Sequence, residues 1–242
     1  GSEHLFFDGY GDGHYDDDCV FSFLDEFAHV EALVGDRDLM LEACAACPDV
    51  FEFLLPPLKE DREIAELVVS KRGHNLMFCS PLLRADEELV LAAVRNSGRA
   101  LEHAAAELQG APPVVLAAVQ QNGEALMFAS EAMQSDEAVV SAAVAQTSAA
   151  YRYATPAAQA LRGIVLAAVK GSHFVLDAVP EALLSDREVM LAAMEKNATA
   201  ITFCPPLLRG DKDIGLAAVK SNGMNLAKLT PALRADEDVV VK

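Results

Sequence analysis

The chain contains no tryptophan, few aromatic side chains and few bases, and each shortage argues against a class of protein. Among its 242 residues 6% are aromatic, and 19 Lys and Arg stand against 37 Asp and Glu, for a net charge of -18. A chain this acidic is not expected to have nucleic acid or an anionic bilayer as its main partner. Hydrophobic residues make up 52% of the chain, which is too many for a disordered protein.

Cysteine and long apolar runs are also scarce. Five Cys are an odd number at low density, which argues against a disulfide scaffold and favours a reducing compartment. Apolar runs such as Pro113 to Val119 are far shorter than the roughly 20 residues of a membrane span. The first residues show no signal peptide. We therefore expect an intracellular protein, in the cytoplasm or in an organelle if a transit peptide has been removed.

Alanine is abundant, with 42 residues, and the sequence repeats itself. Aligning the sequence on the pattern Asp, any residue, acid, aliphatic residue gives repeats that start every 25 residues, at 36, 61, 86, 111, 136, 161, 186, 211 and 236, although not every copy keeps the full pattern. Position 4 is aliphatic in every copy, and position 8 is Ala in seven of the eight complete copies. A strict period of this length predicts a repeat architecture.

Each repeat shows the pattern of a helix, a tight turn and a second helix. Asp at position 1 is a good N-cap, and apolar residues at 4, 8 and 9, usually also at 6, predict a helix over positions 2 to 11. Asn-Gly or a relative follows at 12 and 13, where Gly suits the left-handed conformation that ends many helices. Apolar positions 16, 19 and 23 predict a second helix near 14 to 20. Pro at 21, as in Pro81, breaks that helix or starts a final turn.

Helices this short cannot bury their apolar faces alone, so neighbouring repeats must stack. We therefore predict an all-α fold, an α-solenoid of short helix-turn-helix repeats with a 25-residue period, over residues 36–242. Residues 21–35 are expected to form a capping helix over the first repeat. Residues 1–20 form an acidic, Gly-rich leader, and the first 35 residues hold nine acids and no Lys or Arg.

The repeat resembles a known family. The clearest copies begin Asp61-Arg-Glu-Ile, Asp86-Glu-Glu-Leu, Asp186-Arg-Glu-Val and Asp211-Lys-Asp-Ile. With the following Leu-Ala-Ala-Val and Asn-Gly, this pattern resembles the repeat family catalogued as domain of unknown function 4116. The resemblance covers roughly residues 36–242; repeats 2, 3, 4, 7 and 8 match well, and repeats 1, 5 and 6 depart from the pattern. It implies helical repeats and an interaction role, and it supplies no catalytic residues.

The departures gather in the middle of the array. Residues 111–160 hold four acids and a single base, and Ala111 and Leu161 replace the capping Asp. One interpretation is drift on a surface that is free to vary. The other is a low-charge partner surface with tyrosine anchors. Its candidate partner-binding residues are Gln120, Gln121, Gln146, Tyr151 and Tyr153.

Bases recur at two positions of the repeat, which we expect to share one edge of the array. Position 2 holds Arg37, Arg62, Arg162, Arg187 and Lys212, and position 24 holds Lys59, Arg84, Arg209 and Arg234. Local pairing with the acids of the next first turn is the simpler interpretation. A basic ladder for an anionic partner is the alternative, which the net charge disfavours.

Two segments suggest metal binding, and neither completes a site. Residues 8–18 loosely resemble a calcium loop, but Tyr10 and Cys19 stand where ligands are needed, so a solvated tail or docking arm is the simpler interpretation. Cys44 and Cys47 form the spacing Cys-x-x-Cys, without a second pair or a nearby His for zinc. We interpret them as core or helix-end residues, and Cys79 and Cys204, at the apolar position 19, as core thiols. No cofactor or metal is predicted.

The sequence contains no phosphate loop, nucleophile elbow or convergent carboxylate pair, so we do not expect an enzyme. We predict a protein–protein interaction or scaffold module that binds another protein or complex, or a structural subunit that docks within a larger assembly. The alternative is a metal-dependent regulator, using calcium or thiolates, or a non-catalytic fragment of an enzyme. Because the ninth repeat stops after seven residues, end-to-end self-association through an open C-terminal repeat is a further expectation.

Overall fold

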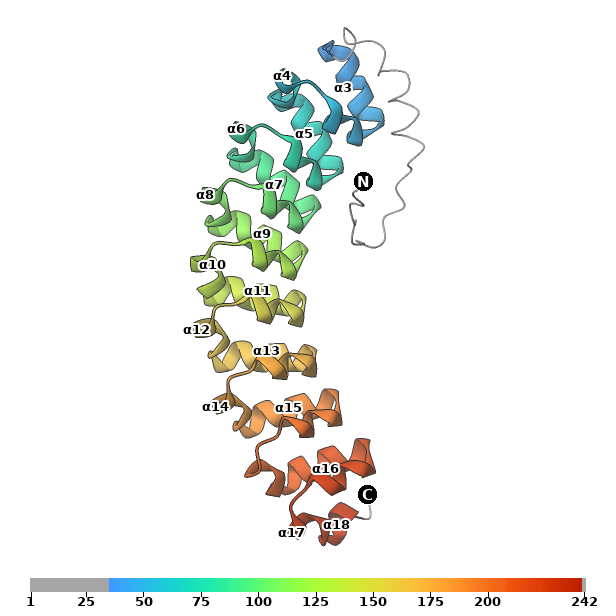
Figure 1. The fold of residues 1–242 in the computed structure, drawn as a ribbon, viewed down its shortest axis with the longest axis vertical. Helices are drawn as coiled ribbons and strands as arrows, with labels where there is room; N and C mark the ends of the chain where they lie inside the picture. The colour runs from blue at the N-terminus through green and yellow to red at the C-terminus, as the bar shows by residue number, and fades with distance from the viewer. Residues whose placement is uncertain (1–34, 241–242) are drawn as a thin grey trace, which may run out of the picture.

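The computed structural model describes residues 35–240, and these form the predicted α-solenoid (Figure 1). The expected leader and capping helix lie outside this range, apart from Gly35. The described residues contain helices and turns and no strand. Each repeat contributes a ten-residue α-helix, a short 3₁₀-helix and a one-turn helix, in that order.

The ten-residue helices occupy positions 2 to 11 of the repeat, as the sequence predicts. They are α3 (Arg37–Ala46), α5 (Arg62–Lys71), α7 (Glu87–Asn96), α9 (Pro112–Gln121), α11 (Glu137–Gln146), α13 (Arg162–Gly171), α15 (Arg187–Lys196) and α16 (Lys212–Ser221). Their N-caps explain where they begin: the Asp61 side chain, for example, accepts hydrogen bonds from the backbone N–H groups of Glu63 and Ile64. Ala111 and Leu161 provide no such cap.

The second half of the repeat differs from the prediction of one helix near positions 14 to 20. It forms a 3₁₀-helix: η1 (Pro48–Phe53), η2 (Gly73–Phe78), η3 (Gly98–His103), η4 (Gly123–Phe128), η5 (Ser148–Tyr153), η6 (His173–Ala178), η7 (Ala198–Thr202) and η9 (Gly223–Lys228). Two extended residues then precede a further helical turn, which in four repeats begins at Pro: α4 (Pro56–Lys59), α6 (Pro81–Arg84), α8 (Ala106–Gln109), α10 (Glu131–Ser135), α12 (Pro156–Gln159), α14 (Glu181–Leu184) and α17 (Pro231–Arg234). Repeat seven has the 3₁₀ turn η8 (Leu208–Gly210) there, and α18 (Glu237–Val240) opens the ninth repeat. Six residues are long for a 3₁₀-helix, whose runs seldom exceed about three to four residues, and extended backbone such as that of Cys79 ends the segment.

The hydrophobic core runs along the whole array between the ten-residue helices and the 3₁₀-helices. In repeat two it takes positions 4, 5, 8 and 9, which are Ile64, Ala65, Val68 and Val69, all buried. Position 6, which the sequence suggested as a core position, is only half-buried in most repeats and exposed at Glu66. Position 5 is better buried: a Cβ at Gly215, for example, would lie 3.1 Å from Leu233 and 3.3 Å from Leu229 in the second half of the same repeat.

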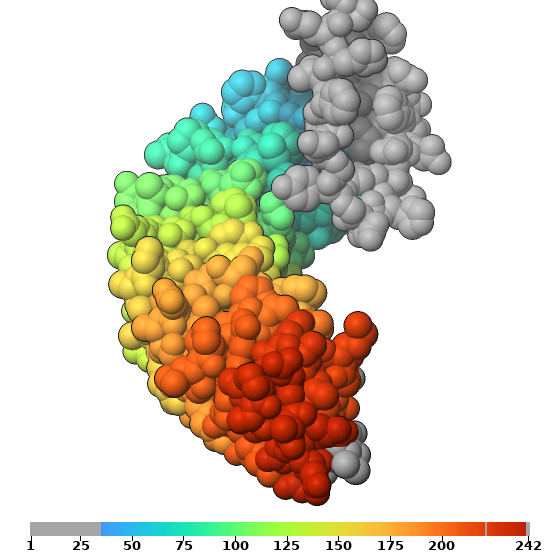
Figure 2. Space-filling model, turned by 60° about the horizontal axis from the view of Figure 1, so that its bottom comes forward, coloured from blue at the N-terminus to red at the C-terminus, as the bar shows by residue number. Residues whose placement is uncertain are grey.

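The array bends into a crescent (Figures 1 and 2). The one-turn helices lie along its outer, convex side, and each ten-residue helix starts there (Figure 1). The C-terminal ends of these helices, with the turns into the 3₁₀-helices, therefore lie on the inner side. Positions 10 to 14 of every repeat are thereby presented along one concave edge.

Glycine at position 13 allows the closest approach between repeats. A Cβ on Gly73, Gly98 or Gly123 would lie 2.2 to 2.4 Å from the carbonyl oxygen of position 8 in the next repeat. None of these glycines has the left-handed φ that the sequence suggested, and position 12 ends the helix in an extended conformation. That prediction was wrong: the glycine is needed for the space that it leaves to the neighbouring backbone.

A ladder of ion pairs joins the first turns of successive ten-residue helices. Arg162, at position 2, lies 2.7 Å from Asp186 and 2.5 Å from Glu188, which are positions 1 and 3 of the next repeat. Its hydrogen bond is the main cause of a lowered pKa at Asp186. The same pairing recurs at Arg37, Arg62, Arg187 and Lys212. The predicted local pairing of these bases is confirmed. Because the bases are exposed to solvent, each single pair contributes little to stability.

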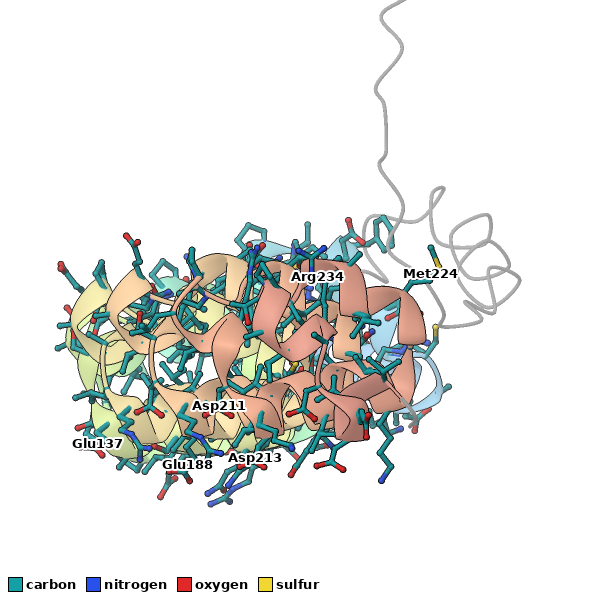
Figure 3. The ribbon with its side chains drawn as sticks, turned by 90° about the horizontal axis from the view of Figure 1, so that it is seen from below. Glu137, Glu188, Asp211, Asp213, Met224 and Arg234 are labelled. Carbon is teal, nitrogen blue, oxygen red and sulfur yellow. The ribbon has the colours of Figure 1, made fainter. Side chains whose placement is uncertain are left out.

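The bases at position 24 do not belong to this ladder. Arg209 donates its Nε hydrogen to the carbonyl oxygen of Cys204, 2.8 Å away. Arg234 lies on the opposite side of the array from Glu188 and Asp213 (Figure 3). The prediction of one shared basic edge was wrong, because position 24 ends the one-turn helix beside its own 3₁₀ segment. Position 24 behaves in the same way in four other repeats, where its side chain donates a hydrogen bond to a carbonyl oxygen of the 3₁₀-helix in the same repeat. These residues are Lys59, Gln109, Gln134 and Gln159.

A second connection, which we call the amide clamp, lies at the other end of the ten-residue helices. The side-chain oxygen of Gln121, at position 11, accepts a 2.6 Å hydrogen bond from the backbone N–H of Gly98 in the preceding repeat. Its amide group donates in turn to the carbonyl oxygen of Asn96, at 3.4 Å. The clamp recurs between Asn96 and Gly73 and between Gln146 and Gly123, at 2.8 Å in both.

A third connection is a backbone link along the convex side. The N–H of Thr155, at position 20, donates to the carbonyl oxygen of Gln134, at position 24 of the preceding repeat, at 3.1 Å. The same hydrogen bond joins Ser80 to Lys59, Ala105 to Arg84, Ser130 to Gln109 and Thr230 to Arg209. Ladder, clamp and link therefore join neighbouring repeats at three separate places.

The close approach at position 13 gives a testable prediction. We expect Gly98→Ala to lower the free energy of unfolding by about 1–3 kcal/mol, because its Cβ must push back the Ala118 carbonyl. The matched control is Gly163→Ala, within α13, where a Cβ meets no atom within 4 Å. That change should be neutral or stabilise by about 0.5 kcal/mol. Urea unfolding followed by circular dichroism measures both; equal effects would contradict the proposed role of Gly98.

Candidate functional site

A groove of about 930 Å³ opens on the concave edge between repeats five and six. Val144 and Val175, both buried, form part of its floor. Phe174 lies beside them and is 71% exposed. Met224 has the same repeat position in repeat eight. In the view from below it lies on the side of the array away from the one-turn helices (Figure 3). The polar lining comes from both repeats: Gln146, Thr147, Ser148 and Arg152 from five, Lys170 and Ser172 from six.

The charges in the groove are positive, although the whole chain is acidic. Arg152 and Lys170 are the ionisable groups among the lining residues, and no acid lines the groove. Arg152 forms a 3.1 Å ion pair with Asp177, in which both side chains are more than half exposed. Lys170 lies in the last turn of α13, where a cation balances the helix dipole. The groove therefore offers an exposed aromatic ring beside two cations.

The groove lies at a junction that lacks the close approach made by Gly73, Gly98 and Gly123. Position 13 of repeat five is Ser148, whose Cβ prevents the contact that Gly73, Gly98 and Gly123 make in repeats two to four. Repeats one, six and seven also lack glycine at this position. Position 11 of repeat six has changed with it: Gly171 replaces the amide, and a Cβ there would lie 1.7 Å from Ser148 Oγ. The serine side chain thus takes the space of the clamp, and no amide holds the two repeats together.

The backbone link is also missing at this junction. Position 20 of repeat six is Pro180, which has no N–H to donate to the carbonyl oxygen of Gln159. The hydroxyl of Tyr151 donates to that oxygen instead, at 2.8 Å. Because Tyr151 and Gln159 both belong to repeat five, this hydrogen bond satisfies the carbonyl without joining the repeats.

The ion-pair ladder is interrupted here as well. Glu137 stands at position 2, where a base is needed, and the next repeat has Leu161 and Gly163 in place of the two acids. Figure 3 shows Glu137 on the same side of the array as the ladder acids Glu188 and Asp213. Among the described residues, the polar contact between these repeats, beyond the connecting turn, is the exposed pair of Arg152 and Asp177.

The residues that the sequence suggested for partner binding differ in their exposure and in their hydrogen bonds. Tyr151 is fully buried, and burial raises its pKa to about 12; it is a core residue, and its prediction as an exposed anchor was wrong. Gln121 and Gln146 are exposed but accept the clamp hydrogen bonds. Gln146 also lines the groove. Gln120 is exposed and Tyr153 half-buried, and their binding role stays a prediction.

The thiols of the described residues lie in the core. Cys44, Cys47, Cys79 and Cys204 are free and buried. Burial, with a smaller contribution from Cys47, raises the pKa of Cys44 to about 12, so its thiol is protonated at neutral pH. The described part of the chain holds no group of three or more His, Cys, Asp or Glu side chains placed to bind a metal ion. The suggested calcium loop lies outside that part.

The structure also reveals a pairing that the sequence analysis missed. Position 14 of one repeat lies next to position 18 of the following one. The rings of His74 and His103 are 5.0 Å apart in this way, and Arg99 lies 5.7 Å from the centre of the Phe128 ring. Burial, with a smaller effect of His74, lowers the pKa of His103. Phe174 stands at position 14, so comparing this column between repeats would have singled it out.

The family model for domain of unknown function 4116 matches residues 61–109, 114–157, 162–209 and 186–234. The chain belongs to this family. Comparisons with curated proteins and with solved structures find no match. Within the described residues of this family member, no helix has both the length and the apolar character needed to cross a bilayer.

The role of Tyr151 can be tested by a double-mutant cycle. Tyr151→Phe should destabilise the protein by about 1 kcal/mol, because the Gln159 carbonyl oxygen loses its donor. In a Pro180→Ala background, a backbone N–H becomes available for the same oxygen, and we expect the loss to shrink by more than half. Urea unfolding of the four proteins measures this coupling. An equal loss in both backgrounds would show that the hydroxyl does not substitute for the missing link.

Proposed function

We propose that this solenoid is a non-catalytic interaction or scaffold module, and that the groove between repeats five and six binds a segment of another protein. The observation that carries the proposal is the exposed ring of Phe174 in a groove lined by two bases and no acid. Exposed aromatic residues in a depression are typical centres of protein interfaces.

The chemistry of the lining defines the partner segment. An apolar side chain would pack on Phe174 and Val175, and carboxylates would face Lys170 and Arg152. Hydroxyls of Thr147, Ser148 and Ser172 provide hydrogen-bonding groups for an extended backbone. A short acidic and apolar segment meets these requirements better than nucleic acid, whose phosphates would meet an acidic chain outside the groove.

Other features of the molecule are consistent with this role. The described residues form an extended, curved surface (Figure 1). Their thiols are free and buried, which suits the reducing compartment that we expect. Docking within a larger assembly and end-to-end association of copies stay predictions.

Two variants at the same repeat position test the groove. We expect Phe174→Ala to reduce recovery of the partner from an extract of the native source by about fivefold or more, as for an interface centre. Met224→Ala is the matched control: it has position 14 in repeat eight and is 83% exposed, but lies far from the groove. A photo-crosslinking amino acid at position 174, and not at 224, should capture the same protein. Loss of recovery in both variants, or in neither, would argue against the groove.

A further inference from the structure

We infer that the junction between repeats five and six is a joint, about which two stiffer parts of the array change their angle. This inference goes beyond the proposed binding and does not depend on it. It rests on how the connections between repeats are distributed along the array.

Every other junction between complete repeats in the described range keeps at least one of the three connections. Junctions one–two and two–three have both the ladder and the backbone link. Junctions three–four and four–five have lost the ladder, but they have the link and the clamp. Junction six–seven keeps the ladder, and seven–eight has ladder and link.

Junction five–six lacks all three, through independent substitutions. Glu137, Leu161 and Gly163 remove the ladder, Ser148 and Gly171 remove the clamp, and Pro180 removes the link. These changes affect both ends of the ten-residue helices, so neither end keeps a ladder, clamp or link. What remains is apolar packing between α11 and α13, which are in contact and carry the buried residues Val140 and Val165, and the exposed ion pair of Arg152 and Asp177.

Packing alone restrains bending less than packing with directional bonds on both edges. Apolar contacts have no strong orientation dependence, whereas a hydrogen bond weakens steeply when its angle changes. The groove also leaves open space on the concave side, into which the repeats can close. Both conditions for a hinge are therefore met at this junction. The groove leaves room for the repeats to close on the concave side, and neither ladder nor link resists opening on the convex side.

Distances between paired spin labels test the joint. Position 22 is exposed in repeats two, three, five and six, at Leu82, Glu107, Ala157 and Ala182. A pair at 107 and 182 spans junction five–six, and a pair at 82 and 157 spans three closed junctions with the same spacing of three repeats. Labels carried by a non-natural amino acid leave the buried thiols intact. We expect the distance distribution of the first pair to be about twofold broader than that of the second.

Restoring a connection should close the joint. Ser148→Gly with Gly171→Gln rebuilds the clamp seen between Gly123 and Gln146, and it should narrow the 107–182 distribution to the width of the control pair. A second variant, Glu137→Arg with Leu161→Asp and Gly163→Glu, rebuilds the ladder instead and covers the case in which the first does not fold. Equal widths in the unmodified protein would overturn the inference, as would an unchanged width in a folded restored variant.

Discussion

The structure depends on how closely the backbones of successive repeats approach. A repeat of 25 residues made of three short helical segments has no core of its own, so each one completes the core of its neighbours. Alanine at position 8 and glycine at position 13 make the tightest contact possible, since a Cβ on Gly98 would lie 2.4 Å from the Ala118 carbonyl. At junction five–six Ser148 stands in place of this glycine, and a groove opens there on the concave edge.

Because repeats are stabilised by each other, substitutions are coupled across junctions rather than within a repeat. Ser148 is compatible with Gly171, because an amide at position 171 would clash with it. At junction three–four, Glu87 stands in place of the base of the ladder, and Ala111 and Pro113 stand in place of its two acids. The base and its acids are therefore missing together. Low charge in the central repeats therefore follows partly from the loss of the ladder, while the amide clamp is kept at junctions three–four and four–five, and does not by itself mark a partner surface.

Much of the fold could be predicted from one repeat, because its signals are local. An Asp N-cap, helical spacing of apolar residues and Pro at a helix start act within a few residues. The groove could not be predicted this way, since it depends on residues in different repeats, such as Ser148 and Gly171. Tyr151 shows the same difficulty: it appeared to be an anchor, but its hydroxyl replaces the donor that Pro180 lacks. Only a comparison of position 16 with position 20 of the next repeat exposes that relation.

The groove and the joint arise from the same substitutions, and this links binding to shape. One wall of the groove, with Thr147 and Ser148, belongs to repeat five, and the other, with Lys170 and Phe174, belongs to repeat six. A segment that contacts both walls interacts differently with the array at different angles between its two parts. By linkage, a ligand that favours one angle shifts the array toward it, and any partner that fixes the angle elsewhere changes affinity at the groove. Since the other junctions between complete repeats in the described range keep a ladder, clamp or link, binding at junction five–six is well placed to alter the curvature of the array.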